Sequence, residues 1–319
     1  MDGAGPPDHK PLDPAKFRDP LVTAAGDTRA SVALDDLKTL WINTGTLCNL
    51  TCENCYIESS PRNDRLSYIT IDEVRAYLDE IGEQNLATEE IGFTGGEPFM
   101  NPDMLQMLEE TLSRGFRALV LTNAMRPMQR HEDALKKLKY WFNDKLVIRV
   151  SIDHYRQELH EAERGIGSWH RMLKGLIWLS QNDFCLDVAG RTPWGEEEAA
   201  MREGYAPLFA EHGISVDTND PAKLVLFPEM DASQDVPEIT EQCWSILNIE
   251  PSAMMCATSR MIVKRKGAEK PAVIACTLLP YDDQFELGTT LADSSKDIPL
   301  NHPHCAKFCV LGGGACSQS

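Results

Sequence analysis

Three cysteines with close spacing are the residues of this chain best suited to metal chemistry. Cys48, Cys52 and Cys55 form a C-x3-C-x2-C pattern, and the next possible ligands along the chain are His131 and Cys185. A structural zinc site normally closes with four protein ligands, whereas a reactive centre keeps one position open. Three thiolates also suit a [4Fe–4S] cluster with one iron left for another ligand. A fragment of a zinc knuckle is the alternative interpretation.

Two further groups of residues follow predicted strands and can bind a ligand beside the cysteines. The first is the turn Gly95-Gly96-Glu97-Pro98, in which two residues without a Cβ atom let the backbone approach a ligand closely. The second is Ser151 and Asp153, which lie two positions apart on a strand and therefore face the same side. Arg191 is a weaker candidate. An ordinary turn and plain polar strand ends remain the alternatives.

A second set of cysteines occupies the last quarter of the chain. A predicted hairpin, with strands over 260–265 and 271–277, brings Cys276 opposite Ser259 and therefore near Cys256. The glycine-rich end of the chain adds three more thiols, Cys305, Cys309 and Cys316. A small module with a weak core often needs such a metal centre to fold, and structural zinc is one possibility. Cys243 is either a further ligand or a buried side chain.

Strands and helices alternate between the two cysteine clusters. Strands are predicted over 39–44, 90–94, 117–121, 146–152, 184–189 and 223–227, with intervening helices that include one capped by Thr70 and Glu73. Six such units predict an α/β fold, either an incomplete (β/α)6 barrel or an open parallel sheet. We expect an extension over 1–34, the α/β domain over 35–236 and a small cysteine-rich, hairpin-containing module over 237–319.

Composition limits the partners and the location of the protein. The 319 residues include 49 acidic and 31 basic side chains, which gives a formal charge of −18. So acidic a chain is a poor partner for nucleic acid or for anionic membranes. We therefore expect neither partner, and no sequence run is apolar enough for a spanning helix or a secretory signal. A cytoplasmic location follows as an expectation, and there cysteines are more often ligands or catalytic groups than disulfides.

The motifs together, in their order along the chain, resemble those of the radical S-adenosylmethionine (SAM) superfamily. The resemblance covers about residues 37–230. It implies a [4Fe–4S] cluster held by Cys48, Cys52 and Cys55, whose free iron binds SAM. It also implies SAM contacts from the Gly95-Gly96-Glu97 turn and from Ser151 and Asp153. Where the family often has an aromatic residue before the third cysteine, this chain has Asn54.

The C-terminal cysteines resemble the SPASM or twitch extension of such enzymes, which binds auxiliary iron–sulfur clusters. A full SPASM module has seven cysteines, and this region has six. The resemblance therefore implies one auxiliary cluster, held by Cys256, Cys276, Cys305 and either Cys309 or Cys316.

The function that this resemblance implies is reductive cleavage of SAM to a 5′-deoxyadenosyl radical, which abstracts hydrogen from a substrate. Oxidative modification of a peptide or protein side chain is the expected outcome, with a flavodoxin or ferredoxin as electron donor. Two alternatives remain open: the same chemistry on a small metabolite, and a zinc or iron–sulfur protein that is not an enzyme.

Overall fold

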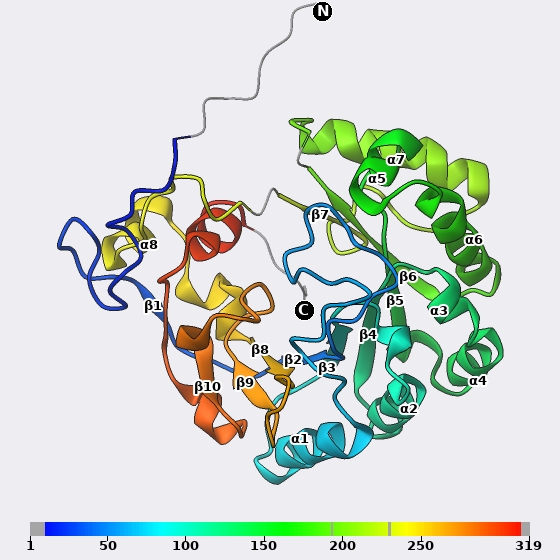
Figure 1. The fold of residues 1–319 in the computed structure, drawn as a ribbon, viewed down its shortest axis with the longest axis horizontal. Coiled ribbons are helices and arrows are strands. Elements are labelled where there is room, and N and C mark those ends of the chain that lie inside the picture. The colour runs from blue at the N-terminus through cyan, green and yellow to red at the C-terminus, as the bar shows by residue number, and fades with distance from the viewer. Residues whose placement is uncertain (1–9, 193, 229–230, 314–319) are drawn as a thin grey trace, which may run out of the picture.

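A curved, mostly parallel sheet forms the frame of the protein in a computed structural model, which describes residues 10–192, 194–228 and 231–313 (Figure 1). The sheet has the strand order β10-β9-β8-β2-β3-β4-β5-β6-β7. Its central strands β2 to β7 are all parallel and follow the order of the chain. They are β2 (Thr39–Asn43), β3 (Glu90–Thr94), β4 (Arg117–Thr122), β5 (Leu146–Ser151), β6 (Cys185–Arg191) and β7 (Leu224–Phe227). The six predicted strands and the incomplete-barrel fold are thus confirmed.

Helices cover the outer face of this sheet, where Figure 1 shows them in an arc around strands β3 to β7. The helix capped by Thr70 and Glu73 is confirmed, because the Thr70 side chain accepts from the Glu73 backbone and the Glu73 carboxylate accepts from Thr70. The helices are α1 (Ile71–Glu83), α2 (Met104–Ser113), α3 (Arg126–Gln129), α4 (Glu132–Phe142), α5 (Gln157–Arg164), α6 (Ser168–Gln181), α7 (Glu198–His212) and α8 (Glu241–Leu247).

The alternation of side chains along the strands divides the apolar interior into two cores. Leu40 and Ile42 of β2 belong to the large core between the sheet and its helices. Trp41, which lies between them and faces the opposite side, belongs to a second core shared with the C-terminal region. The inner face of the sheet is therefore closed by the C-terminal region, as an incomplete barrel requires.

The predicted C-terminal hairpin is present and is joined to the main sheet. Strand β8 (Ser259–Val263) pairs in parallel with β2, and β9 (Ala272–Ile274) pairs antiparallel with β8. The observed pairing of Met261 with Ile274 has the predicted register, but β9 ends two residues before Cys276, so the expected place of Cys276 opposite Ser259 stays a prediction. Strand β10 (Glu286–Gly288) completes this edge, and β1 (Ser31–Val32) pairs with β11 (Ile298–Pro299) in a small second sheet. The module boundary at residue 237 remains a prediction.

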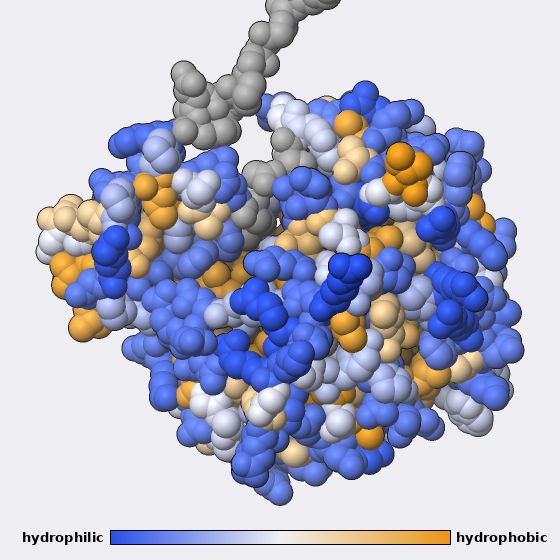
Figure 2. Space-filling view, viewed as in Figure 1, coloured by the Kyte–Doolittle hydropathy of each residue, from blue (hydrophilic) through white to orange (hydrophobic). Residues whose placement is uncertain are grey.

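Hydrophilic residues cover most of the face in Figure 2, and apolar residues appear there in smaller groups. Across the described ranges, we find no helix with the length and apolar character that crossing a bilayer requires.

Candidate functional site

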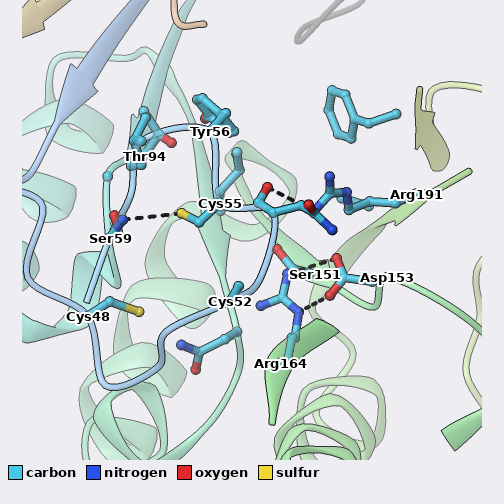
Figure 3. Close-up of a pocket in the computed structure, with 18 of the residues that line it drawn as sticks. Cys48, Cys52, Cys55, Tyr56, Ser59, Thr94, Ser151, Asp153, Arg164 and Arg191 are labelled. Atoms are coloured by element: carbon cyan, nitrogen blue, oxygen red, sulfur yellow. Dashed lines mark hydrogen bonds and ion pairs between the residues drawn. The ribbon is translucent and has the colours of Figure 1, made fainter. Parts of the chain in front are cut away.

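The carboxyl ends of the central strands surround a cavity of about 170 Å³. Its wall is built from the ends of β3 to β7 together with the loop that follows β2 (Figure 3). In open α/β sheets this edge is the usual place for ligands, because the connecting loops diverge there. Of the predicted site residues, the wall includes Cys48, Cys52, Cys55, Gly95, Gly96, Ser151, Asp153 and Arg191.

All three cysteines of the first cluster reach this cavity from the loop after β2. The backbone N–H of Leu50 donates to Cys48 Sγ at 3.4 Å, and that of Ser59 donates to Cys55 Sγ at 3.3 Å. Burial raises the pKa of the Cys48 thiol to about 12 and that of Cys52 to about 11. Raised pKa values favour the protonated thiols. A bound metal ion reverses this preference, because the thiolate is the form that binds metal. The donor set, three soft sulfurs with backbone N–H support, fits an iron–sulfur cluster.

The glycine turn after β3 is packed against the backbone of the cysteine loop. Gly95 has φ +130°, and a Cβ atom on it would lie 2.5 Å from the carbonyl oxygen of Gly45. A Cβ on Gly96 would lie 2.2 Å from the carbonyl oxygen of Leu47. The absence of side chains therefore serves the contact between two backbone segments, and it leaves both glycines on the cavity wall.

The Glu97 side chain does not share the cavity wall with the two glycines before it. Its carboxylate is 1% exposed and accepts hydrogen bonds from Thr122 Oγ1 at 2.8 Å, the Asn123 backbone N–H at 2.9 Å and the Phe99 backbone N–H at 3.2 Å. Asn123 in turn donates to Asn49 in the cysteine loop at 3.0 Å. Burial raises the pKa of Glu97 to about 7. The side chain thus joins the ends of β3 and β4 beneath the site.

Ser151 and Asp153 lie on the cavity wall as expected, but Asp153 already has a partner. Its two carboxylate oxygens pair with the Arg164 guanidinium, and the Arg164 Nη2 to Asp153 Oδ1 distance is 3.0 Å. Figure 3 shows Arg164 next to Ser151, with its guanidinium bonded to Asp153 on one side and with Cys52 lying on the other side. The guanidinium interacts electrostatically with Cys48 and Cys52, and it is the group that would face an anionic ligand.

Glu163, the residue before Arg164, attaches the cysteine loop to the strand edge. Its carboxylate accepts from the Asn54 backbone N–H at 2.9 Å and from Asn54 Nδ2 at 2.8 Å. It also pairs with Arg191 at 2.6 Å, and Arg191 donates to the Asn54 carbonyl at 3.0 Å. The position before the third cysteine, where radical SAM proteins often have an aromatic residue, therefore holds an amide that anchors the loop.

Glu163 and Arg164 were not predicted from the sequence, because the helix that carries them was not predicted either. Helix α5 has eight residues, most of them polar, and buries only His160 and Glu163. It therefore lacks the apolar periodicity that reveals a helix. Adjacent opposite charges near a helix end are ordinary on a protein surface, so the sequence carries no signal of their role.

The C-terminal cysteines gather at a second, separate cavity. Cys256, Cys276, Cys305 and Cys309 line it together with apolar side chains and His304. Cys316, the remaining predicted ligand, lies outside the described residues. Cys243 is on α8 rather than on this wall, and its sulfur accepts from the Thr240 backbone N–H at 3.4 Å.

Four soft thiols on one apolar wall fit an iron–sulfur cluster or zinc by their donor chemistry. Across the residues that the structure describes, no three His, Cys, Asp or Glu side chains are placed to hold a single metal ion.

Comparison with known proteins identifies the class to which this site belongs. Residues 42–190 match the model of the radical SAM superfamily. The span includes the three loop cysteines, the glycine turn and the ends of strands β3, β4 and β5. The chain therefore contains a radical SAM domain, a class of enzyme domain that uses a [4Fe–4S] cluster and SAM.

Three relatives extend the similarity beyond that domain. The chain is 26% identical over 277 residues to the antilisterial bacteriocin subtilosin biosynthesis protein AlbA of Bacillus subtilis (strain 168), covering 80% of this chain and 58% of AlbA. Streptococcus suis SuiB bound to precursor peptide SuiA matches with a TM-score of 0.57 and 13% identity, over 80% of this chain and 63% of SuiB. Native anSMEcpe with bound AdoMet matches with a TM-score of 0.57 and 13% identity, over 84% of this chain and 82% of anSMEcpe. This chain thus spans about three fifths of AlbA and of SuiB, and the two structures establish similarity of fold.

Proposed function

We propose that this protein is a radical SAM enzyme that modifies a peptide or protein side chain. The observation that carries the proposal is the convergence of Cys48, Cys52 and Cys55 on one cavity with the glycine turn and Ser151. The three thiolates would hold a [4Fe–4S] cluster and leave one iron for SAM. When bound, the cluster supplies one electron that cleaves the sulfonium C–S bond, and the resulting 5′-deoxyadenosyl radical takes hydrogen from the substrate.

The remaining wall of the cavity suits the polar groups of SAM. Arg164 presents a guanidinium that would meet the carboxylate, since charge-assisted pairs of this kind are the strong hydrogen bonds of proteins. Carbonyls of the Gly95-Gly96 turn would accept from the ammonium group, and the Ser151 hydroxyl would meet a ribose hydroxyl. Asp153 is held by Arg164, so we assign it the role of orienting that guanidinium.

The second cavity would hold one auxiliary [4Fe–4S] cluster through Cys256, Cys276, Cys305 and Cys309. The space now enclosed there is about 20 Å³, roughly the room of one water molecule. A [4Fe–4S] cluster needs more space than this, whereas a zinc ion needs less. Structural zinc is therefore the second candidate for this module, and a metal count separates the two.

A peptide substrate is the inference we draw from the relatives. AlbA is named for bacteriocin biosynthesis and its similarity extends over 80% of this chain, beyond the radical SAM domain. SuiB has been solved with a precursor peptide bound. A small metabolite is the alternative substrate class. A flavodoxin or ferredoxin would supply the electron.

Anaerobic iron analysis tests the two metal centres. We expect about eight irons per chain, and about four after Cys48, Cys52 and Cys55 are all replaced by Ala. Cys243→Ala is the matched control, because this thiol lies on neither cavity and should cost no iron. About four irons in the parent, with one zinc, would identify the C-terminal centre as structural zinc. A colourless zinc protein would refute the proposed cluster altogether.

Incubation with dithionite and SAM tests the enzymatic function. The reconstituted protein should release 5′-deoxyadenosine, and the triple Cys→Ala variant should not. If the parent protein releases none while both clusters are present, the chain is an electron carrier or scaffold. A short precursor peptide encoded beside this gene, and its change in mass on incubation, would favour the peptide substrate over a metabolite.

A further inference from the structure

Arg260 on β8 is a buried cation that pairs with no acidic side chain among the described residues. Its side chain is among the largest that the protein buries, with 1% of the residue exposed. Nε donates to the Ser294 carbonyl at 2.9 Å, and Nη1 donates to the carbonyls of Cys256 at 2.5 Å and Ser259 at 2.8 Å. Nη2 has no hydrogen-bond partner within the described part of the chain. Carbonyl oxygens orient the guanidinium, but they do not neutralise its charge.

The other arginines that are buried among the described residues show what is unusual here. Arg29 pairs with Glu238 at 2.5 Å, and Arg149 pairs with Asp187 at 3.2 Å. A buried charge without a partner is costly, so proteins rarely keep one. No carboxylate among the described residues pairs with Arg260, so its counter-charge is not one of the acidic side chains in those ranges.

The location of Arg260 indicates where that counter-charge lies. Its guanidinium is bonded to the backbone of Cys256 and interacts electrostatically with the thiols of Cys256 and Cys276. Both thiols line the second cavity. His304 on the same wall is 8% exposed, and its Nδ1 likewise lacks a hydrogen-bond partner in the described residues. An anionic group in this cavity would place negative charge close to the Arg260 guanidinium and would offer His304 a hydrogen-bond acceptor.

We propose that Arg260 is the internal counter-cation of the auxiliary metal centre and raises its reduction potential. This inference rests on the auxiliary cluster of the proposed function. Four thiolates around a [4Fe–4S]²⁺ core carry a net charge of −2, and reduction by one electron makes it −3. A nearby cation stabilises the more negative state more strongly. Arg260 therefore favours acceptance of an electron at this centre, which suits an oxidative reaction that must release one.

The test is a potentiometric titration followed by electron paramagnetic resonance. The background carries Cys48→Ala, Cys52→Ala and Cys55→Ala, so that only the auxiliary cluster contributes to the signal. Arg260→Met should shift the reduction equilibrium at least tenfold toward the oxidised cluster. For one electron, this lowers the midpoint potential by at least about 59 mV. Arg260→Lys keeps the charge and should shift it less. Arg265→Met is the matched control, because it removes the same charge from the same hairpin at a surface pair with Glu286.

Each outcome separates this inference from the proposed function. An unchanged potential in Arg260→Met, with the cluster present, overturns the role of Arg260 and leaves the auxiliary cluster in place. A background protein without iron overturns the auxiliary cluster and this inference with it. If Arg260→Met fails to bind iron, Arg260→Lys decides: iron binding in the lysine variant supports the requirement for charge, and failure of both variants overturns it.

Discussion

Replacement of Glu97 by Gln should change how the stability of the protein depends on pH. The Glu97 carboxylate is buried beneath the cysteine loop and accepts hydrogen bonds from Thr122, Asn123 and Phe99. Glutamine has nearly the same shape but cannot ionise, and its NH2 group faces at least one backbone donor. The substitution therefore lowers the free energy of unfolding by an amount that is the same at every pH, because the amide is mispaired. It also removes the loss of stability that ionisation of Glu97 causes as pH rises.

The size of the pH-dependent cost follows from the raised pKa. Burial moves the pKa of Glu97 from its ordinary value of 4.5 to about 7. Between these values the folded protein binds the proton that the unfolded chain has released, so stability falls as pH rises. At about 1.4 kcal/mol per pKa unit, ionised Glu97 costs about 3 kcal/mol above pH 7. The mispaired amide of the Glu97→Gln variant would cost about 1–3 kcal/mol at every pH.

Urea unfolding of the reduced, metal-free protein between pH 4.5 and pH 8 measures both contributions. The free energy of unfolding of the parent should fall relative to Glu97→Gln by about 3 kcal/mol across this range. The exposed Glu109→Gln on α2 is the control and should run parallel to the parent. If the difference between the parent and Glu97→Gln stays constant with pH, the buried carboxylate does not titrate as argued.

Three further predictions concern the contacts around the cavity. Gly96→Ala places a Cβ 2.2 Å from the Leu47 carbonyl, so thermal unfolding should show a loss of about 1–3 kcal/mol, and an unchanged melting temperature would refute the close packing. Arg164→Met leaves the Asp153 carboxylate buried without its partner and should cost about 3–5 kcal/mol in urea unfolding. Adding Asp153→Asn should recover part of that loss, and no recovery would argue against the pair. Glu163→Gln weakens the attachment of the cysteine loop and should speed iron release to a chelator about tenfold, which corresponds to about 1.4 kcal/mol in the activation free energy. A rate equal to that of the parent would show that other contacts hold the loop.

Local patterns in the sequence account for most of the fold. The six parallel strands were predicted within two residues of their observed ends, because buried strands of a parallel sheet read as short apolar runs. The C-terminal hairpin and its register were predicted from its turn and its β-rich flanks. Pairing of β8 with β2 was not predicted, since nothing in one strand's sequence specifies a partner more than 200 residues away.

For the cavity, the sequence likewise predicted the lining segments but not the contacts between them. The residue types and order of the cysteines, the glycine turn and the strand-end polar residues indicated which segments would line it. The contacts that these residues make could not be predicted from the sequence. The glycines pack on the cysteine loop, the Glu97 side chain lies beneath that loop, and Asp153 pairs with Arg164. These contacts depend on side-chain directions and on distances between separate elements.

The sequence by itself determined the chemistry that this chain can offer: thiols at metal-binding spacing, glycines at a strand end, and an alternation of elements that brings strand ends to one edge. Tertiary structure alone decided which charges neutralise one another. Helix α5 supplied Glu163 and Arg164, and β8 supplied Arg260, which has no acidic partner in the part of the chain that the structure describes. The reason is physical, because the electrostatic state of a buried group depends on distance and burial, and the spacing of residues along a chain specifies neither.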